Sequence, residues 1–321
     1  KLLNIERVEI LKGPQGTLFG TNSIAGAVNI ITAAPSEEFT LGARVGAGNF
    51  GHQTYSIKAD LPVSSSLLSR IVIGHQESEG FIENVTLNKT LQGGESDTAR
   101  VKLAYTPSEN FGLTLSADWM KEDDNSVNGL ALNNDDQFKG FDYSPGAREV
   151  AHDSLEFERR KIYGGSVNAS WQLGSGMHIE SISALRASEF SDQSEEDYSP
   201  MPVVSSQFDE KSDQVSQEVR LISPSDNRLS YVIGTFLLTQ EVTSSRGAKQ
   251  GTQDVSTSGE LNNDLGAIFG NVNIGLSEIA SLELGLRLQR ENKHLTFSIT
   301  DDIGSFTNGR INEKESISKR L

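Results

Sequence analysis

Two clusters of oxygen-bearing side chains are the first candidates for chemistry in this chain. One consists of Asp123, Asp124 and Asn125, and the other spans residues 133–136. Carboxylate and amide oxygens are the ligands that Ca²⁺ prefers, but neither cluster has the full spacing of a known calcium loop. A solvated acidic surface is therefore the favoured interpretation, with Ca²⁺ binding as the alternative. We predict no cofactor and assign no metal ligands.

Known catalytic spacings do not occur in the sequence. Gly174, Ser175 and Gly176 form a turn-like triplet without the Gly-x-Ser-x-Gly spacing of a nucleophile elbow. The histidines are scattered and lack the spacing of metal ligands. They are His52, His75, His152, His178 and His294. We therefore predict that the protein is not an enzyme.

A glycine-rich segment, residues 5–32, carries the most specific pattern. Its sequence, IERVEILKGPQGTLFGTNSIAGAVNIIT, separates short apolar runs by glycines. The backbone must therefore turn tightly several times within one small packed unit. A phosphate-binding loop would need Gly-Lys-Ser/Thr after its last glycine, whereas Gly20 is followed by Thr21 and Asn22, which argues against nucleotide binding.

This segment closely resembles the end of the plug domain of TonB-dependent outer-membrane receptors. In that family an acidic, branched-apolar run leads into a Gly-Pro-Gln-Gly turn and then into an Asn-Ile-Ile-Thr strand. The chain departs from the usual pattern at Lys12, where Arg is commoner, and at Ala25, where a glycine pair is usual. The resemblance identifies a plug signature of six residues. They are Gly13, Pro14, Gly16, Gly20, Gly26 and Asn29.

Composition narrows the classes of protein that remain. The 321 residues could form two ordinary domains or one large barrel, and the absence of cysteine is compatible with an oxidising envelope compartment. A net charge of -16 argues against nucleic acid as a partner, because phosphate binding needs clustered Lys and Arg. No run approaches the ~18 apolar residues of a membrane helix, although a barrel strand needs only ~9 to 11 alternating residues.

Past Pro35 the dominant period is two, which is typical of strands with one apolar and one polar face. The ladder from Leu282 to Leu288 is a clear case. We count about eleven strands, and the connections between them alternate in length. Short connections lie near residues 62–66, 106–110, 173–176, 224–228 and 275–280. Long ones lie at 79–95, 122–158, 191–211, 244–258 and from 294 onward. Only the first hairpin, at residues 49–51, has a short turn where a long one is expected.

This alternation is typical of outer-membrane barrels, which have tight periplasmic turns and long extracellular loops. Antiparallel pairing predicts that residues 122–158 and 191–211 lie at one end of the sheet, opposite the turns at 106–110 and 224–228. Aromatic residues beside the short turns support a membrane-interface girdle, although aromatics also favour strands in general. They are Tyr105, Phe111, Trp171 and Tyr231.

The resemblance extends to the strands around residues 216–241 and 279–292, and so covers the chain from end to end. It implies an all-β fold: a partial transmembrane antiparallel β-barrel, with about 11 to 12 of the family's 22 strands, and part of a plug. Residues 1–35 would be the C-terminal part of the plug domain and residues 36–321 the N-terminal half of the barrel. It also implies that more plug precedes Lys1 and that more strands follow Leu321.

The function that the resemblance implies belongs to the intact parent protein. It is import of a scarce nutrient chelate, a ferric siderophore or another iron complex by default, across the bacterial outer membrane. TonB, acting through a segment outside this chain, would supply energy by moving the plug. Cobalamin, an oligosaccharide or an aromatic compound are alternative cargoes. A passive porin or a surface-binding β protein is a weaker alternative, because neither needs the plug signature. Ligand-contacting residues are not assigned.

A latch between plug and barrel is the mechanistic expectation. In the resembling family, basic plug residues near the Gly-Pro turn meet barrel glutamates. Arg7 and Lys12 are the candidates on one side and Glu218 on the other, with a Glu218–Arg220 pair as the alternative. An unpaired charge wedged between plug and wall would be costly.

If apolar strand faces meet lipid, seven charged residues face the lumen. They are Arg44, Lys58, Arg100, Lys102, Glu218, Arg220 and Arg287.

Overall fold

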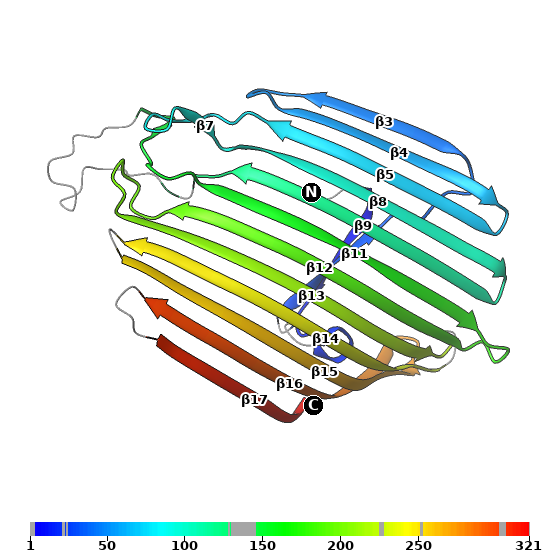
Figure 1. The fold of residues 1–321 in the computed structure, drawn as a ribbon. Helices are drawn as coiled ribbons and strands as arrows, with labels where there is room; N and C mark the ends of the chain where they lie inside the picture. Colours follow the sequence, from blue (N-terminus) through cyan, green and yellow to red (C-terminus); the bar gives the residue numbers. More distant parts are fainter. Residues whose placement is uncertain are drawn as a thin grey trace.

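The computed structural model describes residues 4–20, 23, 25–127, 129, 146–224, 228–250, 253–301 and 306–320. One antiparallel sheet of 12 strands dominates it, and the strands follow one another in sequence order (Figure 1). These strands are β3 (Thr40–Ala47), β4 (Gln53–Ser64), β5 (Leu67–Ser78), β8 (Gly93–Ser108), β9 (Phe111–Asn125), β11 (Phe157–Gln172), β12 (His178–Glu195), β13 (Val204–Ile222), β14 (Leu229–Gln250), β15 (Gln253–Ser277), β16 (Ala280–Asp301) and β17 (Phe306–Arg320). The predicted class, an all-β partial barrel, is confirmed.

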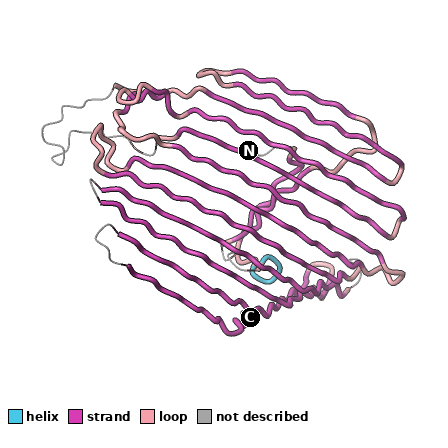
Figure 2. The backbone as a smooth tube through the Cα atoms, viewed as in Figure 1, coloured by secondary structure: helices cyan, strands magenta, loops and turns pink. Residues whose placement is uncertain are grey.

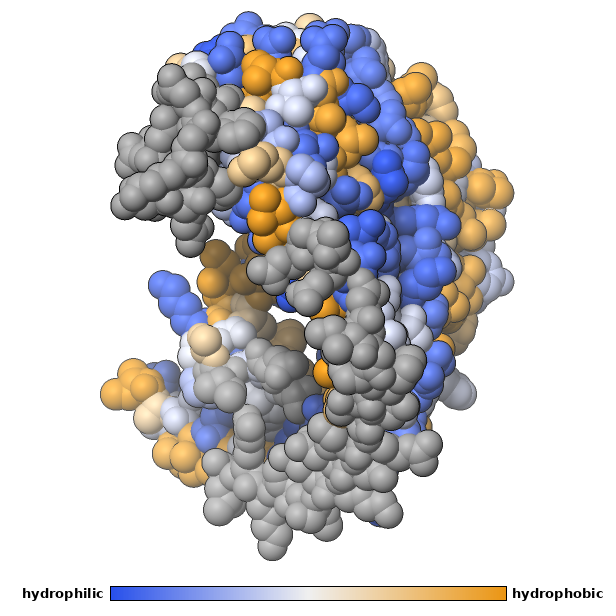
Figure 3. All heavy atoms as spheres, turned by 60° about the vertical axis from the view of Figure 1, so that its left-hand side comes forward, coloured by the Kyte–Doolittle hydropathy of each residue, from blue (hydrophilic) through white to orange (hydrophobic). Residues whose placement is uncertain are grey.

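The two faces of this sheet differ in polarity, as the period of two requires. Leu284 is 56% exposed on the convex face, whereas Arg287 is only 9% exposed on the concave face. Figure 3 shows apolar residues, in orange, gathered along the convex outer side of a wall that curves around a hollow. The leucine ladder therefore faces outward, as predicted. In the described ranges, no helix is long and apolar enough to cross a membrane.

Two aromatic belts mark the edges of the apolar band. Phe111 pairs in register with Trp171 at the short-turn end, and Trp119 pairs with Tyr163 eight residues further along the same two strands. At ~3.4 Å per residue and a tilt of ~45°, the belts are roughly 20 Å apart, close to the ~25 Å band of outer-membrane barrels. The sequence analysis identified only the first belt.

The strands continue well beyond this band, which corrects the predicted loops. β14 has 22 residues and β15 has 25, so the predicted long connection at 244–258 is almost entirely strand. The same holds for residues 294–301, which belong to β16. Outside the membrane both faces of a strand meet water, so the alternating pattern disappears while the backbone ladder persists. A prediction based on alternation therefore makes these strands too short.

The loop order is as predicted. β9 ends and β11 begins at the same end of the sheet where β12 ends and β13 begins, and we call this the outer end. A short strand, β10 (Glu149–Val150), does lie within residues 122–158. It pairs with β6 (Ile82–Asn84), which pairs with β7 (Lys89–Leu91), in a separate three-stranded sheet. The parity of the large sheet is therefore unchanged.

The N-terminal unit consists of β1 (Ile5–Lys12), α1 (Gly16–Phe19) and β2 (Gly26–Thr32). β1 and β2 form an antiparallel hairpin that is not hydrogen-bonded to the large sheet. It crosses the wall diagonally, with the single described helix at one end (Figure 2). Gly26 is essential to this hairpin, because a Cβ there would lie 2.3 Å from the Leu11 carbonyl oxygen and its φ is +146°.

Candidate functional site

The N-terminal unit touches the inner wall at two places, and the first involves α1. Thr17 lies against Gly285 of β16, where a Cβ would be 2.9 Å from the Thr17 Cγ2. Gly20 caps the helix with φ +78° and lies over Arg287, whose Nη2 would be 3.1 Å from a Cβ at Gly20. Two glycines, one on each side, therefore allow the close approach of the unit to the wall.

Arg287 is held in a cup of aromatic rings on the wall. Its guanidinium carbon lies 5.8 Å from the ring centre of Phe236 and 5.5 Å from that of Phe269. The ring of Phe269 lies across Gly234, where no side chain stands in the way. Nε donates to the Gln289 Oε1 at 3.1 Å. Cation–π contacts of this kind partly replace a carboxylate partner.

The second contact is at the other end of the unit. Lys102 of β8 donates from Nζ to the carbonyl oxygen of Thr32 at 2.8 Å and to its Oγ1 at 2.7 Å. Arg70 and Arg100 lie near enough to Lys102 to repel it, and Glu6 near enough to attract it. The unit thus lies against two basic side chains: Lys102 on β8, which donates hydrogen bonds to Thr32, and Arg287 on β16, which lies close to Gly20.

The predicted latch is wrong in both its partners and its polarity. Arg7 forms ion pairs with Glu6 at 2.8 Å and Glu9 at 2.7 Å within its own strand; Arg7 and Glu6 are exposed and Glu9 is partly exposed. Glu218 pairs with Arg220, the alternative considered from the sequence. Lys12 is exposed, and no described carboxylate forms an ion pair with it. The physical reason is that β1 already supplies acidic partners locally, while the wall, not the unit, contributes the cations.

The plug-signature residues shape the unit itself. Gly13 ends β1 with φ +84°, and the Asn29 Nδ2 donates to the Glu9 Oε2 at 3.0 Å across the hairpin. Hydrogen bonds to Glu9, from Arg7 first and Asn29 second, lower the pKa of this carboxyl. Pro14 precedes α1, and nothing in the structure explains why residue 16 is glycine, because a Cβ there would meet no atom within 4 Å.

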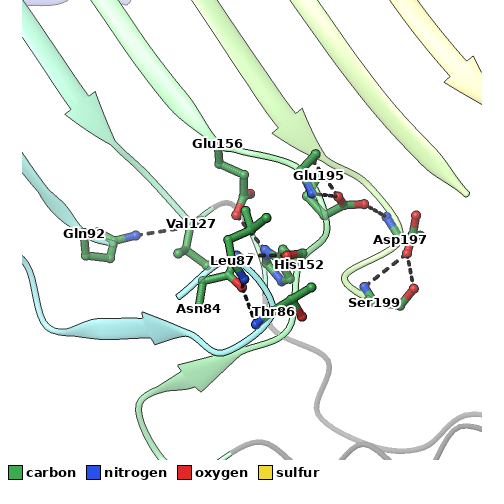
Figure 4. Close-up of polar contacts among 11 residues, drawn as sticks. Asn84, Thr86, Leu87, Gln92, Val127, His152, Glu156, Glu195, Asp197 and Ser199 are labelled. Atoms are coloured by element: carbon green, nitrogen blue, oxygen red, sulfur yellow. Dashed lines mark hydrogen bonds and ion pairs between the residues drawn. The ribbon is translucent and has the colours of Figure 1, made fainter. Parts of the chain in front are cut away.

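A second polar constellation lies at the outer end, where three loops meet (Figure 4). This outer-end cluster consists of Asn84, His152, Glu156, Glu195 and Asp197. The Asn84 Nδ2 donates to the His152 carbonyl oxygen at 3.0 Å, and the His152 Nδ1 lies 2.6 Å from the Glu156 Oε2. The side chains of His152 and Glu156 are both almost completely buried.

Glu195 connects two of these loops. It is 1% exposed, and its Oε2 accepts from the Ser154 Oγ at 2.6 Å. Burial raises the pKa of Glu195 to about 7; the Asp197 carboxylate also raises it, while hydrogen bonds from Ser154 and from the Asp197 backbone act in the opposite direction. Asp153, Glu195 and Asp197 each offer an oxygen within 4.8 Å of the others. This group could hold a cation, but acidic groups commonly cluster without one, and we assign no metal to it.

The calcium candidates from the sequence are placed differently. Asp123, at the end of β9, accepts from the Arg159 Nε at 3.2 Å, which favours an ordinary ion pair. Residues 133–136 lie outside the described residues. The outer-end cluster could not have been found by local spacing, because its members come from segments about forty to seventy residues apart along the chain. Only their burial in the fold reveals them.

The chain is similar in sequence to known transporters and receptors, although no family model matches it. Over 115 residues the chain is 27% identical to the vitamin B12 transporter BtuB of Vibrio vulnificus, which covers 36% of this chain and 19% of that protein. Over 112 residues it is 30% identical to the pesticin receptor of Yersinia enterocolitica, covering 34% and 16%. The matched region thus spans less than a fifth of these curated relatives.

Solved structures match almost the whole chain. The ferric yersiniabactin uptake receptor FyuA from Yersinia pestis superimposes with a TM-score of 0.82 at 17% identity, over 98% of this chain and 49% of that one. The siderophore receptor PiuA from Acinetobacter baumannii gives 0.71 at 13% identity, over 97% and 51%. The chain therefore corresponds to about half of such a receptor. In fold, and in sequence over the matched regions, the chain is therefore similar to TonB-dependent receptors of the bacterial outer membrane.

Proposed function

We propose that the intact protein actively imports a scarce nutrient chelate across the outer membrane, with a ferric siderophore or another iron complex as the first candidate. The observation that carries this is the N-terminal unit on the inner face of the wall, which it contacts through α1 and through Thr32. A passive porin needs no such unit. The similar FyuA is described as a ferric yersiniabactin uptake receptor, and PiuA as a siderophore receptor. Cobalamin is the second candidate, because BtuB is a vitamin B12 transporter.

In this proposal residues 1–35 are the end of the plug domain and residues 36–321 are the first half of the barrel. TonB would pull on a part of the plug that lies outside this chain. The proposed latch is the observed contact set, Thr17 on Gly285, Gly20 on Arg287 and Thr32 on Lys102, in place of Arg7, Lys12 and Glu218. The wall of the barrel would face lipid outside and cargo inside. No catalytic step is part of the proposal.

The test is uptake by the intact receptor in a host that lacks its own chelate receptors. Labelled ferric chelates of several chemical classes, and labelled cobalamin, are offered with and without a working TonB. We expect at least one to accumulate only when both the receptor and TonB are present. Uptake of every compound at the background rate, by a receptor shown to be folded in the outer membrane, would refute the proposal.

A further inference from the structure

Both wall residues that hold the N-terminal unit are cations whose hydrogen-bond and ring partners are neutral groups, while a carboxylate near each one, Glu6 for Lys102 and Glu218 for Arg287, attracts it without forming an ion pair. Lys102 donates hydrogen bonds to the carbonyl and hydroxyl oxygens of Thr32. Arg287 contacts two rings and the amide oxygen of Gln289, and it lies where a side chain at Gly20 would stand. Within the described part of the chain, neither forms an ion pair with a carboxylate. Arg220 and Arg186, which lie on the same face, are paired with Glu218 and Asp118.

This arrangement is unusual for a nearly buried guanidinium. An arginine carries five N–H donors, and among the described residues only Nε of Arg287 has a hydrogen-bond acceptor, Gln289. Burying a charge without a hydrogen-bonded opposite charge is unfavourable, and the rings of the cup and the attraction of Glu218 compensate it only in part. The free side of the guanidinium points at Gly20, where a side chain would not fit without displacing it.

Removing the N-terminal unit would break no ion pair at either residue. It would expose two cations of the wall, Lys102 on β8 and Arg287 on β16, to the open lumen, and it would also remove the attraction of Glu6 for Lys102. Uncovered guanidinium and ammonium groups bind carboxylates and other oxyanions by charge-assisted hydrogen bonds, and the planar fork of arginine does so in a bidentate manner. The rings of Phe236 and Phe269 would flank an anion bound to Arg287.

We propose that Arg287 and Lys102 form anion-binding sites of the lumen wall that the N-terminal unit covers at rest and uncovers when it moves. Their ligand is an oxyanion, such as a carboxylate, carried by an anionic chelate on its way through the barrel. The inference rests on the proposed function, because it assumes that the unit is displaced during import. It adds the charge class of the cargo and two residues along its path.

The test uses the intact receptor in planar bilayers, with the unit displaced by urea at concentrations that leave the barrel folded by circular dichroism. Citrate is the probe, and its block of the ionic current is titrated for wild type, Arg287→Gln and Arg287→Lys. We expect Arg287→Gln to raise the half-blocking citrate concentration by about tenfold or more and Arg287→Lys by less. Lys102→Gln should also weaken the block. Arg186→Gln, which removes a lumen cation already paired with Asp118, is the matched control and should leave it unchanged.

Two results would overturn the proposal. If Arg287→Gln lowers the urea needed for opening but leaves the citrate block as in wild type, Arg287 only anchors the unit. If Arg186→Gln weakens the block as much as Arg287→Gln, the effect is general wall charge and not a site. Failure of the proposed transport function is distinguishable, because it would show as absent uptake in cells while the citrate block still depended on Arg287.

Discussion

The N-terminal unit and the outer-end cluster are attached to the same barrel in opposite ways. The unit is held by hydrogen bonds from Lys102 to Thr32, and two glycines allow its close approach to the wall near Arg287. The outer-end cluster is held by buried, mutually hydrogen-bonded side chains such as His152 and Glu156. Breaking one member of a buried pair is costly, whereas lifting a neutral backbone from a cation leaves that cation in water. The difference indicates that the N-terminal unit can be released from the wall, whereas the outer-end cluster stays in place.

The largest expected effect is in the outer-end cluster. Replacing His152 by Ala removes one partner of a buried pair and leaves Glu156 without its imidazole. We expect the free energy of local unfolding of the outer-end cluster to fall by about 3 to 5 kcal/mol. Limited proteolysis of the folded receptor should show faster cleavage within residues 146–156. Arg159→Ala, which breaks an exposed pair with Asp123, is the control and should change the rate little.

The next effect concerns the protonation of Glu195. Its pKa is raised from 4.5 to about 7 in the folded protein. Near neutral pH the Glu195 carboxyl therefore binds a proton while the outer-end cluster is folded and releases it when the cluster unfolds. The resulting stabilisation is complete below about pH 4.5 and is lost as the pH rises through about 7, and we expect it to reach about 2 kcal/mol. Protease protection measured in a chelating buffer should therefore be higher at pH 5 than at pH 8. Glu195→Gln should remove this difference; an unchanged pH profile would show that Glu195 is not its source.

A smaller effect is expected where the unit approaches the wall. Replacing Gly285 by Ala places a Cβ 2.9 Å from the Thr17 Cγ2, which should weaken the attachment by about 1 to 3 kcal/mol. The urea concentration at which the receptor begins to conduct should fall. Adding Thr17→Ala restores the space, so the double variant should recover part of the loss. Equal opening in all three proteins would mean that α1 is not part of the attachment.

The smallest effect is predicted for the residue that the sequence analysis favoured. Glu218 pairs with Arg220, partly exposed on the same strand, so Glu218→Gln should change retention of the unit by less than about 1 kcal/mol. Opening in urea should match wild type within error. If Glu218→Gln opened the receptor as readily as Gly285→Ala, the originally predicted latch would be correct and the contact set described here would be incomplete.

Strand faces and tight turns, which depend on local sequence pattern, could be predicted from the sequence. Contacts between segments that are distant along the chain could not. Alternation along Leu282–Leu288 predicted the outward face, and the glycines near Gly13 predicted a tightly turned unit. Strand ends such as residues 244–250 were missed because polar strands in water have no alternation. Arg287 was expected to face the lumen, but its aromatic cup depends on the register of three strands, which no single segment encodes. The outer-end cluster was missed for the same reason.

One measurement tests most directly whether the unit must leave the wall during import. The chain has no cysteine, and the Thr17 Cβ lies 3.3 Å from the position of a Cβ at Gly285, close to the ~3.5 to 4.5 Å of a disulfide. A receptor carrying Thr17→Cys and Gly285→Cys should bind its chelate normally at the cell surface when oxidised but fail to import it. Reduction should restore uptake. Import at the wild-type rate with the disulfide fully formed would contradict the account, because cargo would then pass while α1 stays fixed to β16.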